Sequence, residues 1–240
     1  MRFILLFAIM LQAPSFKDIQ VQQPRVKLAY LEKEKVVQQY FKNKNLIDKD
    51  FHLYLRAFKK EGELEVWVRE ASKETYAHLH TYPFCTSSGS LGPKRKEGDL
   101  QIPEGVYHIN HFNPLSNFYL SLGLNYPNAS DKILSDKQRP GGSIYIHGSC
   151  VTIGCIPITD DKIKELYLLA VEARNNGQQK IPVHIFPTRL NNDGMSYLKN
   201  SQQDLRHVEF WKNLKLVFDD FEQTKKIKPI KVNSVGLYQF

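Results

Sequence analysis

The sequence predicts a mainly β fold with α-helices at both ends of the domain. Three segments, 51–58, 63–70 and 76–84, alternate apolar and polar residues as half-buried strands do. Aromatic residues make up 12% of the chain, and they favour strands because they fit a pleated, half-buried surface. Over 202–221, apolar residues recur at three- and four-residue steps, as in an amphipathic helix: Leu205, Val208, Trp211, Leu214, Phe218 and Phe221.

The chain begins with a segment that is typical of a secretory signal peptide, predicted over residues 1–13. Arg2 is followed by an apolar run from Phe3 to Leu11 and a small residue at Ala13. A run of this length is too short for a bilayer, which needs about 20 apolar residues. The alternative is a buried N-terminal strand or helix. We expect an exported protein, periplasmic or secreted, without stable transmembrane insertion.

The charge balance is basic, with 33 Lys and Arg against 25 Asp and Glu. Nucleic acid is not an expected partner of an exported protein, so a basic surface would meet an anionic polymer or a membrane face. The alternative is a protein that is basic without using its charge for binding. The segment "KKIKPIK" (225–231) has little apolar periodicity and is predicted to be a loosely ordered tail.

The remaining elements divide the chain into three parts after the signal peptide. Residues 14–50 are predicted as an N-terminal helical extension, extended over 17–27 and helical over 28–41. Residues 51–187 form the main domain, and 188–240 a C-terminal helix with the basic tail. Inside the main domain we expect a hairpin turn at 60–62, a long functional loop at 86–105, strands at 106–112, 118–124, 143–148 and 181–187, and a helix over 159–177.

The stretch "SIYIHGSCVTIGCIP" concentrates the chemistry of the chain. A predicted strand ends at His147, Gly148 turns the chain, and Gly154 and Cys155 lie just before a predicted helix. Cysteine acts as a nucleophile as its thiolate, and an imidazole and a helix N-terminus both favour that form. Gly154 would let a substrate approach, and the amide of Cys155 would donate to an oxyanion. We therefore predict Cys155 as nucleophile and His147 as proton donor and acceptor.

The alternatives for these two residues are a buried structural thiol and a histidine satisfied at a strand end. A papain-like protease is not indicated, because His147 precedes Cys155 by only eight residues.

This stretch resembles the signature of the L,D-transpeptidase catalytic domain family (the YkuD type), in which a His-Gly pair precedes Ser/Thr-x-Gly-Cys. Here these are His147-Gly148 and Thr152-Ile153-Gly154-Cys155. Upstream, "SSGSLGPKRKEGDLQIPEGVYHI" resembles the YafK-like branch of that family in its Leu-Gly-Pro-Lys and Glu-Gly-Asp elements. The resemblance covers about residues 51–187 and implies an L,D-transpeptidase-like β-sandwich or barrel with flanking helices.

Two departures from the wider family stand out. Most members have a longer gap between the histidine and the cysteine motif, whereas the short gap here resembles the YafK-like branch. Many also carry an arginine two residues after the cysteine, where this chain has Pro157. Loss of that guanidinium would remove a bidentate carboxylate ligand.

The resemblance implies acyl transfer on peptidoglycan stem peptides that contain diaminopimelate. The thiolate would attack the carbonyl of an L-centre and form a thioester, which water or an amine resolves. The branch favours hydrolytic release of a peptidoglycan-linked outer-membrane lipoprotein. L,D-transpeptidation is the alternative, and a non-catalytic cell-wall binding module is the alternative from another class. No cofactor is implied.

Several neighbouring residues are predicted with supporting roles. The backbone groups of Gly148, Ser149 and Gly154 are expected to shape the loop, hold the imidazole and face an oxyanion. Lys94 and Tyr145 are candidate substrate-binding residues, with a solvated loop and the sheet core as their alternatives.

The other cysteines and histidines leave two structural alternatives open. Cys85 and Cys150 are expected to be two separate buried thiols, with a disulfide between them as the alternative, because pairing requires Cα atoms within about 7 Å. A zinc site formed by His108, His111, His147 and a cysteine is the weaker alternative to no metal, since "HINH" would direct its histidines to opposite faces of a strand.

Overall fold

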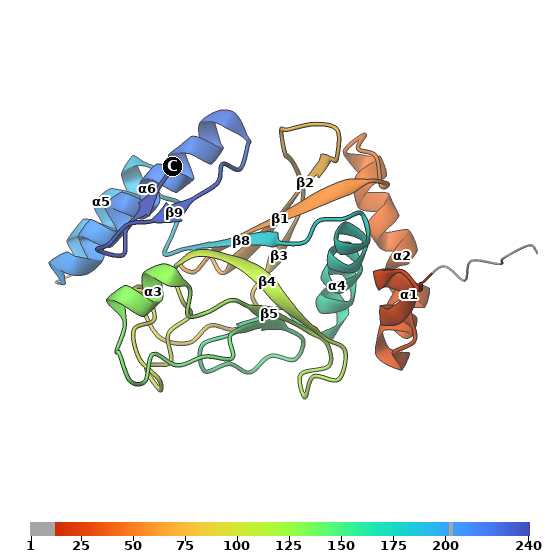
Figure 1. Cartoon of the computed structure of the whole chain (residues 1–240), viewed down its shortest axis with the longest axis horizontal. Helices are drawn as coiled ribbons and strands as arrows, with labels where there is room; N and C mark the ends of the chain where they lie inside the picture. Colours follow the sequence, from red (N-terminus) through yellow and green to blue (C-terminus); the bar gives the residue numbers. More distant parts are fainter. Residues whose placement is uncertain (1–12, 202–203) are drawn as a thin grey trace, which may run out of the picture.

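The scaffold of the protein is one curled eight-stranded sheet, shown in Figure 1 for a computed structural model that describes residues 13–201 and 204–240. The strand order is β3-β2-β1-β8-β4-β5-β6-β7. Neighbouring strands pair antiparallel except β1 with β8 and β6 with β7, which are parallel. The strands are β1 Phe51–Phe58, β2 Glu63–Glu70, β3 Ala77–Pro83, β4 Gly105–Asn113, β5 Ser121–Leu124, β6 Tyr145–His147, β7 Ile156–Pro157 and β8 Ile181–Phe186.

Helices cover the two faces of this sheet. Helix α4 packs against β1, β5, β6 and β8, and α1 and α2 pack on its outer side. Helices α5 and α6 lie over the other face with the small hairpin β9–β10. The elements are α1 Phe16–Val21, α2 Pro24–Asn43, α3 Ala129–Leu134, α4 Asp160–Asn175, α5 Asn192–Ser201, α6 Leu205–Thr224, β9 Lys231–Val232 and β10 Tyr238–Gln239. The mainly β fold with flanking helices is confirmed.

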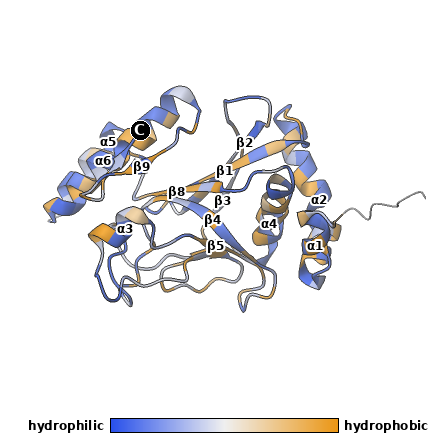
Figure 2. Ribbon diagram, in the orientation of Figure 1, coloured by the Kyte–Doolittle hydropathy of each residue, from blue (hydrophilic) through white to orange (hydrophobic). Residues whose placement is uncertain are grey.

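Strand β1 explains why the sheet needs cover on both faces. Leu53, Leu55 and Ala57 belong to the core cluster that includes the apolar face of α4. The alternate residues point to α6, where the Tyr54 ring lies 4.8 Å from the Phe221 ring. Successive side chains of a strand point to opposite faces, so a strand this apolar is buried on both. The helices that cover the sheet carry both hydrophobic and hydrophilic residues (Figure 2).

The N-terminal extension is part of the main core rather than a separate unit. Val26, Ala29, Val37 and Phe41 of α2 belong to the same buried cluster as the sheet. The expectation that 17–27 is extended is wrong, because α1 spans most of the first half of this segment and α2 begins at Pro24. Polar residues conceal α1 in the sequence, since its start is fixed by a capping box between Ser15 and Asp18.

The basic tail is also ordered, contrary to expectation. It ends in β9 and β10, and the Asn213 side chain of α6 bonds both the amide and the carbonyl of Tyr238. Tyr238 is buried, and its hydroxyl oxygen accepts bonds from the Val106 amide and from the Asn128 side-chain amide. These contacts, which periodicity does not reveal, attach the tail to the domain.

The predicted signal peptide lies outside the described residues except for Ala13. In the described part of the chain, no helix is long and apolar enough to cross a membrane.

Candidate active site

The pairing of β6 with β7 brings the segments of His147 and Cys155 together. In the parallel pair β6–β7, Ile146 is opposite Ile156 and His147 is opposite Pro157. Ile146 and Ile156 are both completely buried and point into the core. Because strand side chains alternate between faces, His147 points to the opposite face from Ile146. Cys155 lies just ahead of β7, and its thiol is next to β6, where the Tyr145 amide donates to it.

The imidazole of His147 is held in one tautomer. Its Nδ1 lies 2.5 Å from the carbonyl oxygen of Gly148. A carbonyl oxygen only accepts, so Nδ1 carries the proton and Nε2 keeps its lone pair. Burial lowers the pKa of His147, and the bond to Gly148 offsets this only in part. A neutral ring with a free Nε2 is the form that takes a proton from a nucleophile.

The thiol of Cys155 is partly exposed and lies beside β6. The amide of Tyr145 donates to its Sγ at 3.4 Å, and Sγ lies 3.6 Å from the carbonyl oxygen of Ser143. Burial raises the pKa of Cys155, while the Tyr145 amide and the positive charge of Lys94 act in the opposite direction. The thiol is therefore protonated at rest, and attack on a substrate requires a base.

Thr152 organises the segment that presents Cys155. Its Oγ1 accepts the amides of Gly154 at 3.1 Å and Cys155 at 2.8 Å, and donates to the carbonyl of Cys155 at 2.8 Å. The amides expected to face an oxyanion are thus directed to this hydroxyl. The threonine of the Ser/Thr-x-Gly-Cys motif could have indicated such a role, but residue spacing alone did not.

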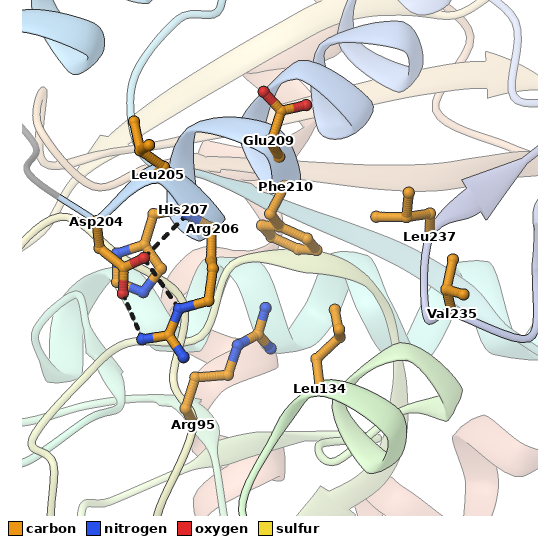
Figure 3. Close-up of a pocket in the computed structure, with 10 residues that line it drawn as sticks. All are labelled: Arg95, Leu134, Asp204, Leu205, Arg206, His207, Glu209, Phe210, Val235 and Leu237. Atoms are coloured by element: carbon orange, nitrogen blue, oxygen red, sulfur yellow. Dashed lines mark hydrogen bonds and ion pairs between the residues drawn. The ribbon is translucent and has the colours of Figure 1, made fainter.

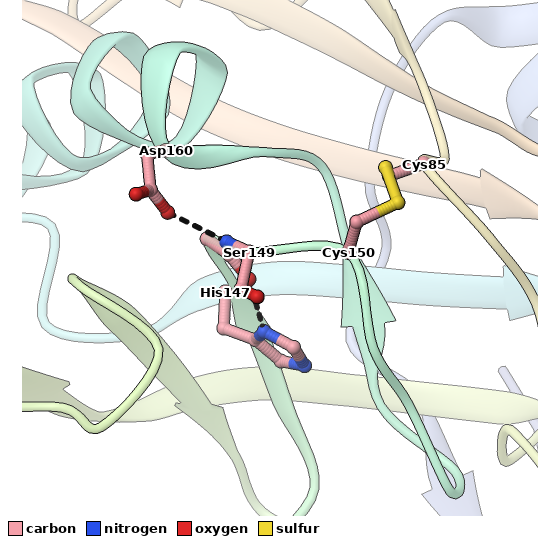
Figure 4. The surroundings of a disulfide bond; sticks show 6 residues. Cys85, His147, Ser149, Cys150 and Asp160 are labelled. Atoms are coloured by element: carbon pink, nitrogen blue, oxygen red, sulfur yellow. Dashed lines mark hydrogen bonds between the residues drawn. A yellow bond between two sulfur atoms is a disulfide. The ribbon is translucent and has the colours of Figure 1, made fainter.

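The residues after His147 are fixed by their backbone. Gly148 donates its amide to the carbonyl of Leu120, and Ser149 donates its amide to Oδ1 of Asp160 at 2.6 Å (Figure 4). A Cβ on Gly148 would lie 2.5 Å from that same Oδ1 and 2.7 Å from the carbonyl oxygen of Phe118. Glycine is required here by space. Asp160, in the first turn of α4, thereby anchors the site loop.

Cys85 and Cys150 form a disulfide, so the expectation of two separate thiols is wrong (Figure 4). Their Cα atoms lie 5.3 Å apart although 65 positions separate them in sequence. The Cys85 amide donates to the carbonyl of Pro157, which brings the end of β3 beside β7. Cys155 remains as the free thiol.

The long loop between β3 and β4 forms a second wall of the site. An added Cβ on Gly154 would lie 3.0 Å from the carbonyl oxygen of Gln101 in this loop. The loop is held by Glu104, which is fully buried and accepts bonds from Lys59, from the Gly92 amide and from the Trp211 indole. These bonds fix the loop to β1 and to α6.

Lys94 and Tyr145 occupy different positions relative to the site. Lys94 is buried inside the loop, where its Nζ bonds Asp99 at 2.6 Å and the carbonyl of Lys96. Its positive charge acts to lower the pKa of the Cys155 thiol, but its hydrogen bonds join it to other residues of the loop. Tyr145 is half-buried on the same face as His147, and its ring lies 6.2 Å from that of His111.

Among the described residues, no group of three or more His, Cys, Asp or Glu side chains is arranged to hold a metal ion. A cavity of about 660 Å³ lies at the start of α6 rather than at Cys155 (Figure 3). Its lining residues are Arg95, Leu134, Asp204, Leu205, Arg206, His207, Glu209, Phe210, Val235 and Leu237. The site is therefore identified by its chemistry and not by the size of a cavity.

Comparison with known proteins agrees with this geometry. The model of the L,D-transpeptidase catalytic domain (YkuD) matches residues 60–185, and the chain belongs to this family. The "Putative L,D-transpeptidase YafK" of Escherichia coli K12 is 35% identical over 182 residues, which cover 75% of this chain and 70% of the relative. The protein of the same name from strain O157:H7 matches to the same extent.

Solved structures show more distant similarity. The helical cell shape determining protein Pgp2 from Campylobacter jejuni is 19% identical, with 84% of this chain and 80% of that chain covered and a TM-score of 0.45. Bd1075 from Bdellovibrio bacteriovorus is 24% identical, with 72% and 60% covered and a TM-score of 0.40. Structural similarity of this extent supports no conclusion about function.

Proposed function

We propose that this protein is an exported cysteine enzyme that transfers acyl groups from peptidoglycan stem peptides, with Cys155 as nucleophile and His147 as general base and acid. The observation that carries the proposal is the free Nε2 of a neutral His147 on β6, the strand beside which the Cys155 thiol lies. Membership of the L,D-transpeptidase family supports the substrate class.

The chemistry proceeds in two balanced steps. As Sγ of Cys155 forms a bond to the carbonyl carbon of the L-centre of diaminopimelate, its proton passes to Nε2 of His147. The tetrahedral intermediate collapses, the amide C–N bond breaks, and the imidazolium returns the proton to the leaving amine. A water molecule or an amine then attacks the thioester, with His147 again accepting the proton, and Sγ leaves as the thiol.

The oxyanion of the intermediate needs donors close to Cys155. The amides of Gly154 and Cys155 are the nearest candidates by sequence, and both donate to Thr152 in this structure. For these amides to serve, the Thr152 hydroxyl must give way as the substrate carbonyl enters. Gly154, in the left-handed region at φ +135°, provides the necessary freedom of the backbone.

Export is supported by two independent features. Residues 1–13 have the pattern of a signal peptide. The Cys85–Cys150 disulfide suits an oxidising compartment such as the periplasm, because cytosolic thiols are kept reduced.

Hydrolytic release of a peptidoglycan-attached lipoprotein is the outcome that we favour, on the resemblance to the YafK-like branch. The alternative is L,D-transpeptidation, which the name of the Escherichia coli relative supports. Both outcomes share the acyl-enzyme and differ only in whether water or an amine resolves it. A non-catalytic binding module would need neither the free Nε2 of His147 nor the free thiol of Cys155.

The test is product analysis with residues 14–240 and a Cys155→Ala control. Both proteins are incubated with sacculi that carry bound protein and with defined tetrapeptide muropeptides, and the products are identified by mass spectrometry. Released protein or shortened peptides without new cross-links, absent in the control, identify a hydrolase. New diaminopimelate–diaminopimelate cross-links identify a transpeptidase. Identical products from both proteins would contradict a catalytic Cys155.

A further inference from the structure

Arg25, near the start of α2, binds the backbone of the loop between β4 and β5. One guanidinium nitrogen, NH1, donates to the carbonyl of Ser116 at 2.6 Å and to that of Tyr119 at 2.7 Å. The guanidinium carbon also lies 5.6 Å from the centre of the Tyr119 ring. These are bonds from a charged donor, which are stronger than those between neutral groups. Arg25 lies outside residues 60–185, the part of the chain that matches the family model.

The loop that Arg25 binds packs against the imidazole of His147, the proposed general base. Between the two carbonyls lies Phe118, whose ring is 4.6 Å from the His147 imidazole at an angle of 32°. Directly after them, the carbonyl of Leu120 accepts the amide of Gly148. Phe118 keeps 39% of its surface exposed, so it covers one face of the imidazole while facing solvent itself.

We propose that Arg25 is a positioning residue, through which the N-terminal extension holds Phe118 against the imidazole of His147. This deepens the proposed function, because it concerns the same histidine, and it assigns a role to a segment outside the matched domain.

The backbone of the loop shows why it needs such a hold. Tyr119 has φ +71°, in the left-handed region that bulky side chains rarely adopt. Conformations of this kind cost about 1–3 kcal/mol and persist only where neighbouring groups enforce them. Arg25 bonds the carbonyl of Tyr119 itself, and Lys164 of α4 lies over the same ring at 5.3 Å while pairing with Glu32 of α2. Two contacts from α2 therefore converge on the strained residue, one of them through Lys164.

The consequence for His147 follows from water exclusion. Burial is the largest cause of its lowered pKa. The segments next to His147 carry four charged or titratable groups: Asp160, which accepts the Ser149 amide, Cys155 ahead of β7, Lys94 near that thiol, and Arg25 on the Tyr119 carbonyl. None of them is among the causes of the lowered pKa of His147. If Phe118 moves away, water reaches the imidazole, its charged form becomes less unfavourable, and its pKa rises towards the ordinary value.

The experiment measures the pH titration of His147 directly by NMR, on residues 14–240 with labelled histidine. The signal is assigned from the spectrum of His147→Gln. Arg25→Ala and Phe118→Ala are compared with the parent protein, with their double variant, and with Lys27→Ala, an exposed cation on the same helix. Because Arg25 and Phe118 are both exposed, we expect the variants to fold, and thermal unfolding checks this.

We expect the midpoint to rise in Arg25→Ala and in Phe118→Ala, and to stay unchanged in Lys27→Ala. In the double variant it should equal that of Phe118→Ala alone, because both changes act through one ring. A midpoint in Arg25→Ala equal to that of the parent, or shifts that add in the double variant, would overturn the inference. The readout needs no turnover, so it stands apart from the test of the proposed function.

Discussion

Oγ1 of Thr152 lies 2.8 Å from both the amide nitrogen and the carbonyl oxygen of Cys155. One hydroxyl therefore fixes both peptide groups of Cys155, and it also accepts the amide of Gly154. Its single proton and both of its lone pairs are used. Thr152 therefore fixes the backbone of Cys155, while the Tyr145 amide and the Ser143 carbonyl contact its Sγ.

Replacing this hydroxyl tests its importance. Thr152→Val keeps the shape of the side chain but leaves two amides without their acceptor, which should lower the free energy of unfolding by about 1–3 kcal/mol. Turnover should fall with it, because the segment that carries Cys155 loses the bonds that hold it in place before the substrate carbonyl takes over the two amides. Thr152→Ser should retain most of both quantities. Urea denaturation and muropeptide turnover are the measurements, and a valine variant that matches the parent would remove Thr152 from the site.

The lowered pKa of His147 predicts how activity depends on pH. A general base acts in its neutral form, and a lowered pKa keeps the imidazole neutral below its ordinary value of 6.5. The acidic limb of kcat/KM should therefore lie below pH 6.5. His147→Gln should lower kcat by roughly 10²- to 10⁴-fold and abolish this limb. An acidic limb above pH 6.5 would mean that the ring is more hydrated than the structure shows.

The Cys85–Cys150 disulfide should stabilise the fold and keep the site loop in place. It closes a loop of 65 positions, for which the chain-entropy model gives about 4 kcal/mol. In urea denaturation, the double variant Cys85→Ala/Cys150→Ala should have a free energy of unfolding lower by about that amount. Reducing agent should destabilise the parent but not the variant. Equal stability of parent and variant, with the parent shown by mass spectrometry to be oxidised, would contradict the prediction.

His184 of β8 predicts a loss of stability in acid. It is buried beside Arg56, its Nδ1 lies 2.7 Å from the Tyr54 hydroxyl, and burial lowers the pKa of His184 to about 3. Its neutral form contributes stability above pH 6.5, and this contribution is lost as the pH falls from 6.5 towards 3. In His184→Gln, Tm should change less with pH over that interval than in the parent. The exposed His111→Gln serves as control and should follow the parent curve.

The sequence predicted the strands where alternation is strict. Segments 51–58 and 63–70 are β1 and β2 to the residue, although the half-buried strand expected from this alternation is wrong for β1, which is buried on both faces. It did not predict α1 or the hairpin β9–β10. Both depend on polar contacts within the fold: the side chain of Gln20 in α1 accepts a bond from the Tyr167 hydroxyl, and the Asn213 side chain bonds the carbonyl of Tyr238 in β10. Such partners are far away in sequence and leave no periodic signal.

The pair His147 and Cys155 could be proposed from local spacing, because both lie at the ends of short adjacent strands. The groups that surround the pair could not. Asp160, Thr152 and Arg25 act on main-chain amides and carbonyls, and every residue carries those groups. The disulfide depended on the separation of Cys85 and Cys150 in space, which only the folded sheet determines.

The most direct test of a nucleophilic Cys155 is to trap the acyl-enzyme. The protein is mixed with a defined tetrapeptide muropeptide, quenched in acid after short times, digested and analysed by mass spectrometry. We predict a thioester on the peptide that contains Cys155, with an added mass equal to the substrate less the free terminal amino acid that leaves, formed far more slowly in His147→Gln. If the parent turns over substrate and no adduct forms on Cys155 at any time, the chemistry proposed for this protein is wrong.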